Sequence, residues 1–155
     1  MKWGGQFEQE KKDRAGSSYS HSDRNGDILV YSKGKKSDKT ILVTVNGKSF
    51  KAELYDNQAA QGFYDALPLT LDMQELNGNE KYYNLDTSLP TKSYPAGHIS
   101  KGDLRLFGDN CIVLFYDSFF SGYSYTNIGH ISDSEGIDEA LGSGSVTVTF
   151  SVNRS

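Results

Sequence analysis

The side chains that could do acid–base or metal chemistry are widely spread in this sequence. It contains three histidines, His21, His98 and His130, and no two of them have the close spacing of a zinc-binding pair. Asp103 and Glu80 could act as paired carboxylates, as in a glycosidase. However, Asp103 directly follows Gly102 at the start of an expected strand, where capping of a turn accounts for it. The sequence therefore predicts neither a metal site nor a carboxylate pair.

Motifs for covalent catalysis and phosphate binding are not found. The sequence contains no GxSxG segment and no Walker loop. The segment GSGS, residues 142–145, precedes an expected strand, whereas a phosphate cradle needs a following helix. The single cysteine, Cys111, excludes an intrachain disulfide, and its place in the apolar run CIVLFY predicts a buried side chain rather than a nucleophile.

Aromatic side chains are the remaining candidates for a binding site. Glu80 is followed by Tyr82 and Tyr83 at the start of an expected strand. We expect Glu80 to hydrogen-bond a backbone turn, with a polar contact to a ligand as the alternative. Four further aromatic residues follow one another closely: Phe119, Phe120, Tyr123 and Tyr125. They could stack on a peptide or a sugar, or form a lid over one end of the fold.

Composition limits the classes of partner. A chain of 155 residues suits one domain with a sizeable core. Its net charge of -4 gives no basic field for a phosphate backbone, so we expect no nucleic-acid partner. The sequence has no run of eighteen apolar residues that would span a membrane, and its first residues lack the apolar segment of a secretory signal. These observations leave the compartment open.

The chain divides into a polar tail and a patterned body. Residues 1–38 are rich in Ser, Lys, Asp and Gly and follow neither hydrophobic period, which predicts a flexible tail, with mobility over residues 1 to about 27. The apolar run ILVY, residues 28–31, could be an extra edge strand or a sticky patch on that tail. The body, residues 39–155, must then position every candidate side chain.

The first half of the body predicts a hairpin, a helix and two strands. Residues 41–45 and 48–54 flank Asn46-Gly47, a dipeptide that favours a type I′ turn. Asp56 or Asn57 can cap the helix that follows, and Leu67-Pro68 ends it, because the residue before a proline is pushed out of the helical region. The segments LTLDMQEL and EKYYNL are then two strands.

The second half predicts a buried hairpin, a short helix and a last strand. LRLF and CIVLFY form the hairpin, and the unbroken apolar run of the latter indicates a strand buried on both faces. The segments DTSLPTKSYPAG and DSFFSGYSYTN are expected to be loops, and NIGHIS a short strand. Ser134 should cap a short helix that ends at Gly142. In the last strand Val146, Val148 and Phe150 alternate cleanly, so we expect them to pair with residues 41–45 and close a barrel.

Two segments resemble cyclophilins. VTVNGKSFKAELYDNQAAQGFYDAL, residues 43–67, resembles their first hairpin and first helix, and NIGHISDSEGIDEALG, residues 127–142, resembles their late Gly-Lys-Val strand and the helix after it. The pattern over residues 39–155 is similar to compact bacterial cyclophilin-like domains, which are sometimes found with flavodoxin-type proteins. The resemblance implies a mainly β fold: a closed β-barrel of about eight strands, with two short helices over the barrel ends.

The same resemblance implies a test for prolyl isomerase activity. In cyclophilins an arginine after a Phe-His pair hydrogen-bonds near the prolyl nitrogen and favours the twisted amide. The corresponding region here, EKYYNLDTSLPT, contains no arginine. Arg105 lies in another strand, where a solvated strand residue is the simpler interpretation, and it could replace that arginine only by facing the same pocket. Neither Trp3 nor His130 stands where cyclophilins bring a Trp and a His to the rim.

The sequence therefore favours a non-catalytic binding module for a peptide or small ligand. A weak or divergent peptidyl-prolyl isomerase that uses Arg105 is the alternative. By the resemblance, Phe115 matches a phenylalanine of the cyclophilin pocket strand and is the first candidate for a pocket floor, although a core position is the simpler explanation. The candidate ligand-binding residues are Phe115, Tyr82, Tyr83, Glu80 and Arg105. We expect no cofactor and no metal, and the pattern specifies neither the ligand nor the oligomeric state.

Overall fold

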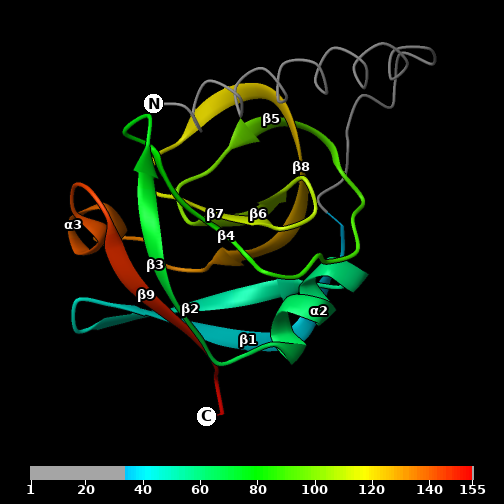
Figure 1. Ribbon diagram of the computed structural model, residues 1–155, viewed down its shortest axis with the longest axis horizontal. Coiled ribbons are helices and arrows are strands. Elements are labelled where there is room, and N and C mark those ends of the chain that lie inside the picture. Colours follow the sequence, from blue (N-terminus) through cyan, green and yellow to red (C-terminus); the bar gives the residue numbers. More distant parts are fainter. Residues whose placement is uncertain (1–33, 155) are drawn as a thin grey trace.

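The computed structural model describes residues 34–154, and Figure 1 shows their arrangement. The strands are β1 (Lys36–Val45), β2 (Lys48–Tyr55), β3 (Leu69–Leu76), β4 (Glu80–Asn84), β5 (Tyr94–Ile99), β6 (Asp103–Phe107), β7 (Cys111–Phe115), β8 (Phe119–Ile131) and β9 (Val146–Val152). The helices are α2 (Gln58–Asp65) and α3 (Ile137–Leu141). The mobility predicted for residues 1–27 and the edge strand at 28–31 lie outside the described residues.

Eight of the strands form a closed antiparallel barrel, as predicted. Their order is β2-β1-β9-β3-β4-β7-β6-β8, and β2 pairs with β8 to complete the circle. Gly129 of β8 permits this closure, because a Cβ there would lie 2.7 Å from the carbonyl oxygen of Glu53. The ninth strand, β5, pairs with the first part of β8 outside the circle. The helices α2 and α3 lie on opposite sides of the barrel in Figure 1.

The last strand lies beside the first, as its alternation predicted. Val43 of β1 is opposite Phe150 of β9. The pairing with β1 predicted for the other two residues was wrong, because Val148 and Val146 are opposite Leu71 and Met73 of β3. Thus β9 is an internal strand held on both sides. The circle itself is completed by β2 and β8.

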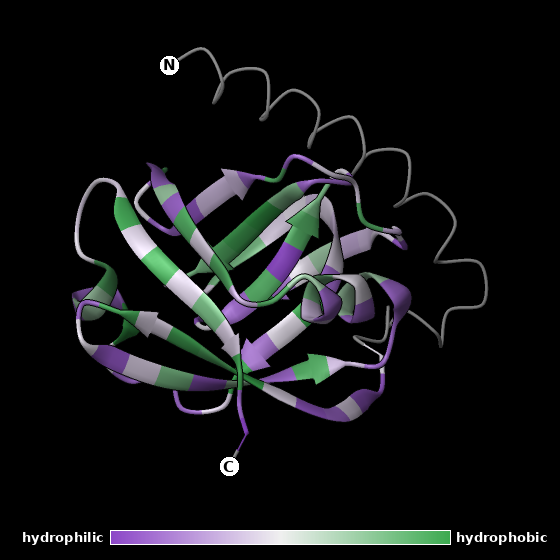
Figure 2. Cartoon of the chain, turned by 60° about the horizontal axis from the view of Figure 1, so that its bottom comes forward, coloured by the Kyte–Doolittle hydropathy of each residue, from purple (hydrophilic) through white to green (hydrophobic). Residues whose placement is uncertain are grey.

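Alternation along the strands divides the apolar residues between two clusters. Figure 2 shows the alternating hydropathy along several strands. One face of β6 and β7 contributes Leu104, Leu106, Ile112 and Leu114 to the barrel interior. The opposite face of β7 contributes Val113 and Phe115 to a second cluster with residues of β5 and β8. The prediction that the later strand of this hairpin, β7, is buried on both faces is therefore confirmed.

Both helices begin where a specific residue permits it. Asn57 caps α2, because its side-chain oxygen accepts a hydrogen bond from the N–H of Ala60 at 2.8 Å. The prediction that Ser134 caps α3 was wrong. The N-cap is Gly136, whose φ of 83° lets the chain enter the helix from the left-handed region. Ser134 contributes only its backbone carbonyl, which accepts from the N–H of Ile137.

Two segments expected to be loops contain strands. The predicted loop before residue 98 includes the start of β5, which tolerates Pro95 because β5 is an edge strand. The predicted aromatic loop is the first part of β8, a strand of thirteen residues. Glycine and serine residues in that part interrupt the alternation of apolar and polar residues by which the sequence would indicate a strand. Nevertheless Ser121, Ser124 and Tyr125 are buried there.

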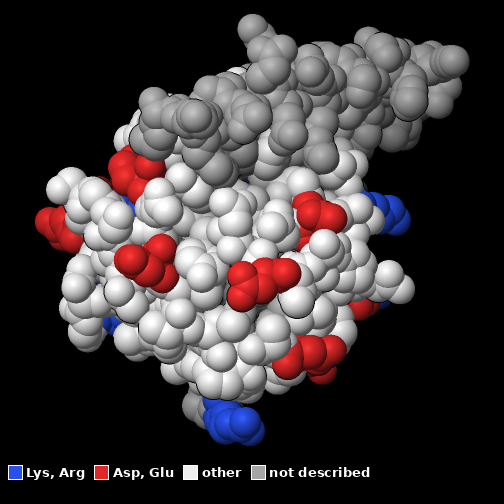
Figure 3. Space-filling model, viewed as in Figure 1, with Lys and Arg blue, Asp and Glu red and all other residues white. Residues whose placement is uncertain are grey.

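The described residues can be compared with the expectations for nucleic acid, membrane and metal. On the face shown in Figure 3, acidic side chains are scattered singly and the basic ones lie near the edges, so the part of that face formed by residues 34–154 shows no continuous basic patch. Within residues 34–154 neither helix has the length and apolar character needed to cross a membrane. The same residues include no cluster of three or more His, Cys, Asp or Glu side chains that could hold a metal ion.

Candidate functional site

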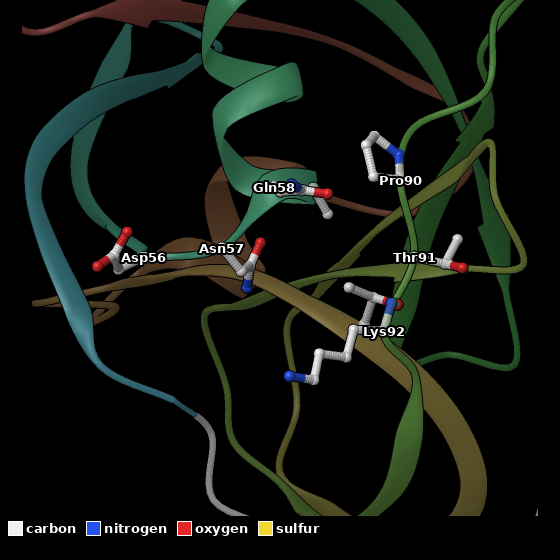
Figure 4. Close-up of a pocket in the computed structure, with 8 residues that line it drawn as sticks. Asp56, Asn57, Gln58, Pro90, Thr91 and Lys92 are labelled. Atoms are coloured by element: carbon white, nitrogen blue, oxygen red, sulfur yellow. The ribbon is translucent and has the colours of Figure 1, made fainter.

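A pocket of about 310 Å³ lies at the start of α2. Its walls are residues 56–59, which lead into the helix, residues 90–92 of the segment before β5, and Thr126 of β8. Figure 4 shows the two chain segments facing each other across it. This volume is at the lower end of the range of small-molecule sites, roughly 300–1,000 Å³.

Hydrogen bonds to β8 fix both walls of the pocket. On one side, the Asn57 amide nitrogen donates to the backbone oxygen of Asn127 at 2.9 Å, while its oxygen caps the helix. On the other side, the hydroxyl of Thr126 accepts from the backbone N–H of Lys92 at 3.0 Å. Because adjacent residues of one strand hold both walls, the pocket is built into the barrel.

Two charged side chains stand at this pocket. Asp56 and Lys92 line opposite walls, and both are exposed. Within the described part of the chain, neither side chain has an ion-pair or hydrogen-bond partner. In Figure 4 the Lys92 side chain extends from its own segment toward the side on which Asn57 and Asp56 lie. The pocket thus offers one carboxylate and one ammonium group.

A buried charge cluster lies on the outer face of the barrel, on the strands β6 and β8. The Asp103 carboxylate accepts from Arg105 Nη2 at 2.8 Å, from His130 Nδ1 at 2.7 Å and from the N–H of Ser100 at 3.0 Å. Burial opposes its ionisation, but the bonds from His130 and Arg105 outweigh this and lower the pKa of Asp103 to about 2. An ionised carboxylate only accepts, so Nδ1 of His130 carries the proton.

The charge cluster continues toward the pocket through polar side chains. Asn127, the residue after the pocket residue Thr126, donates from Nδ2 to the hydroxyl of Tyr94. Burial raises the pKa of Tyr94 to about 12, partly offset by the nearby positive charge of Arg105. Arg105 also lies over the ring of Tyr125, with Cζ 6.0 Å from the centroid. Its Nη1 is buried and has no acceptor within residues 34–154.

The structure brings four of the five predicted site residues to one face of the sheet. Glu80 of β4 is opposite Phe115 of β7. Val113 of β7 has Tyr82 of β4 opposite it on one side and Arg105 of β6 on the other. These four predicted side chains are at most 2 % exposed, so the interpretation of Arg105 as a solvated strand residue was wrong. Tyr83 differs, because it is half-buried and packs against the barrel interior.

Strands β5 and β8 cover this group. The Phe115 ring packs against Phe119 and Tyr125, with centroids 5.8 and 5.6 Å away. Ile99 of β5 belongs to the same apolar cluster. Phe115 therefore occupies a core position, and solvent does not reach it in this structure.

The pocket residues were mostly not singled out by sequence. Asp56 and Asn57 were recognised as candidates for a helix cap, but nothing in their spacing indicates a cavity. Thr91 and Lys92 belong to a segment without regular structure. Pro90 belongs to the segment DTSLPTKSYPAG, for which the sequence predicts only a loop. The placement of this segment opposite α2 depends on β8, whose course was not predicted.

Comparison with known proteins agrees with the fold. A family model described as the cyclophilin-like family matches residues 43–151. The solution structure of the hypothetical protein AF2241 from Archaeoglobus fulgidus is similar, with a TM-score of 0.57 and 17 % sequence identity over 77 % of this chain and 98 % of that chain. The search of curated proteins gave no match. Since the matched range runs from the end of β1 through most of β9 and covers more than half of the chain, the chain belongs to the cyclophilin-like family.

Proposed function

We propose that this domain is a non-catalytic binding module and that its ligand, a peptide or another small molecule, occupies the pocket at the start of α2. The observation that carries the proposal is a cavity of about 310 Å³ whose two walls are both hydrogen-bonded to β8. Preformed concave sites with a few fixed polar groups are the usual places of ligand binding.

The position of Arg105 argues against the isomerase alternative. The cyclophilin mechanism uses an arginine that reaches the amide of its substrate. The Arg105 side chain is only 1 % exposed, and Nη2 and Nε both point to Asp103. Its charge is thus held by a carboxylate, whereas a binding role for the pocket does not require Arg105 to reach solvent.

Shift mapping by NMR tests the proposal. We expect members of a small-molecule and proline-peptide library to shift the amide signals of Asn57, Gln58 and Thr91 in a saturable manner. Thr91→Trp should fill the pocket and abolish these shifts. The matched control is Thr87→Trp, an exposed threonine of the same segment that does not line the pocket.

Two outcomes would contradict the proposal. One is a library in which no compound shifts the pocket signals. The other is acceleration of cis–trans exchange in a proline peptide to cyclophilin-like rates, which Arg105→Ala abolishes. The predicted contact of a ligand with Phe115, Tyr82, Tyr83 or Glu80 is tested by the same spectra, since shifts confined to the pocket would argue against it.

A further inference from the structure

We infer that the ligand of the α2 pocket is a zwitterion, a small molecule with a free ammonium group and a free carboxylate, such as an amino acid or a short unblocked peptide. This inference rests on the proposed function. It adds the chemical class of the ligand, and it assigns the ammonium group to Asp56 and the carboxylate to Lys92.

Their place in the pocket distinguishes these two side chains, since other exposed charged residues, such as Lys51 and Asp72, also have no ion pair within the described chain. Lys36 pairs with Glu53, Lys81 with Glu75, and Arg105 with Asp103. Asp56 and Lys92 have no such partner within residues 34–154, although they line the same pocket. They are also not within ion-pair distance of each other. Each therefore has a charge to offer to a third group.

The opposite signs of the two groups select among ligand classes. A ligand that is only an anion would meet the Asp56 carboxylate, and one that is only a cation would meet the Lys92 ammonium. Like charges brought together are unfavourable and exclude wrong partners. A molecule that carries both charges can pair with Asp56 and with Lys92 at the same time.

The rest of the pocket suits a small body between the two charges. Pro90 and Ala59 supply apolar surface, and Gln58 and Thr91 add neutral polar groups. A volume of about 310 Å³ limits the ligand to a few residues at most. Titration with alanine, dialanine and trialanine would therefore show how far apart the ammonium and carboxylate groups of the ligand must lie.

The decisive experiment compares free and blocked dialanine by NMR titration. We expect free dialanine to shift Asn57, Gln58 and Thr91 saturably. N-acetylation and C-terminal amidation should each raise the Kd by about two- to fivefold, the effect of losing one exposed ion pair. Asp56→Asn should weaken free dialanine as acetylation does, and it should not weaken the acetylated peptide further. Lys92→Met should weaken the binding of free dialanine as amidation does, and it should not weaken the binding of the amidated peptide further.

Controls and contrary results separate the inference from the proposed function. Asp72→Asn and Lys51→Met change exposed charges outside the pocket and should leave the Kd unchanged. If doubly blocked dialanine binds in the pocket as tightly as the free peptide, the ligand class is wrong and the binding function stands. The same holds if only non-zwitterionic library members shift the pocket. If no compound shifts it, the binding function fails as well.

Discussion

Replacing Lys81 by methionine is expected to lower the free energy of unfolding by about 3–5 kcal/mol, the range for breaking a buried ion pair. The Lys81 side chain is fully buried in β4. Its ammonium group donates three hydrogen bonds, to Glu75 at 2.9 Å, to the carbonyl of Gly142 at 2.8 Å and to that of Gly144 at 2.6 Å. An ammonium has three donors, so all are used.

The loss would be large because the backbone oxygens of Gly142 and Gly144 would lose the Lys81 donor, while Glu75 would keep two other donors but lose its counter-charge. Glu75 also accepts from the hydroxyl of Tyr116 and from the N–H of Gly78. Lys81 therefore ties the β3–β4 hairpin to the turn between α3 and β9. Urea denaturation measures the change, with Lys51→Met, an exposed lysine of β2, as the matched control. A shift of less than about 0.5 kcal/mol for Lys81→Met, typical of surface changes, would contradict this role.

Replacing Asp103 by asparagine should also destabilise the fold by about 3–5 kcal/mol, because it leaves the Arg105 guanidinium buried without a counter-charge. The Asp103 and Arg105 side chains are 3 % and 1 % exposed. The change also removes the carboxylate that orients His130, whose side chain is 28 % exposed. Asp72→Asn, on the exposed side of β3, is the control and should have little effect.

The Asp103 carboxylate should also make the free energy of unfolding depend on pH in the acid range. The pKa of Asp103 is about 2 in the folded protein, below the ordinary value of 3.8. The unfolded chain therefore binds the proton first as the pH falls. The contribution, on the order of 2 kcal/mol, is complete above pH 4 and is lost progressively between about pH 4 and pH 2. In Asp103→Asn this part of the decrease should disappear. Equal slopes for the variant and the parent protein in urea titrations across this range would contradict the assignment.

Much of the fold could be predicted because the signals are local. Asn46 and Gly47 have φ values of 49° and 81°, as the type I′ turn requires. Asn57 caps α2 through its own side chain. The unbroken apolar run of β7 correctly indicated burial on both faces. In each case the cause and the structure lie within a few residues of each other.

The site could not be predicted in the same way, because partner choice along the strands is not local. Nothing near His130 in the sequence indicates that its ring meets Asp103, which depends on the register of β6 against β8. Arg105 was considered as a replacement for a catalytic arginine, yet its partner stands two residues away on the same face of the strand. The pocket, too, exists only because Asn57 and Lys92 are both bonded to β8.

The internal position of β9 bears on how the chain folds during synthesis. β9 is the last strand in the sequence, but it lies between β1 and β3. Until it has left the ribosome, both of those strands present unpaired edges, which are templates for aggregation. The contact of Ile41 with Val152 also joins the two ends of the barrel sequence, and such non-local pairing slows folding. The nascent barrel therefore cannot close before its last strand emerges, and until then its open edges need protection.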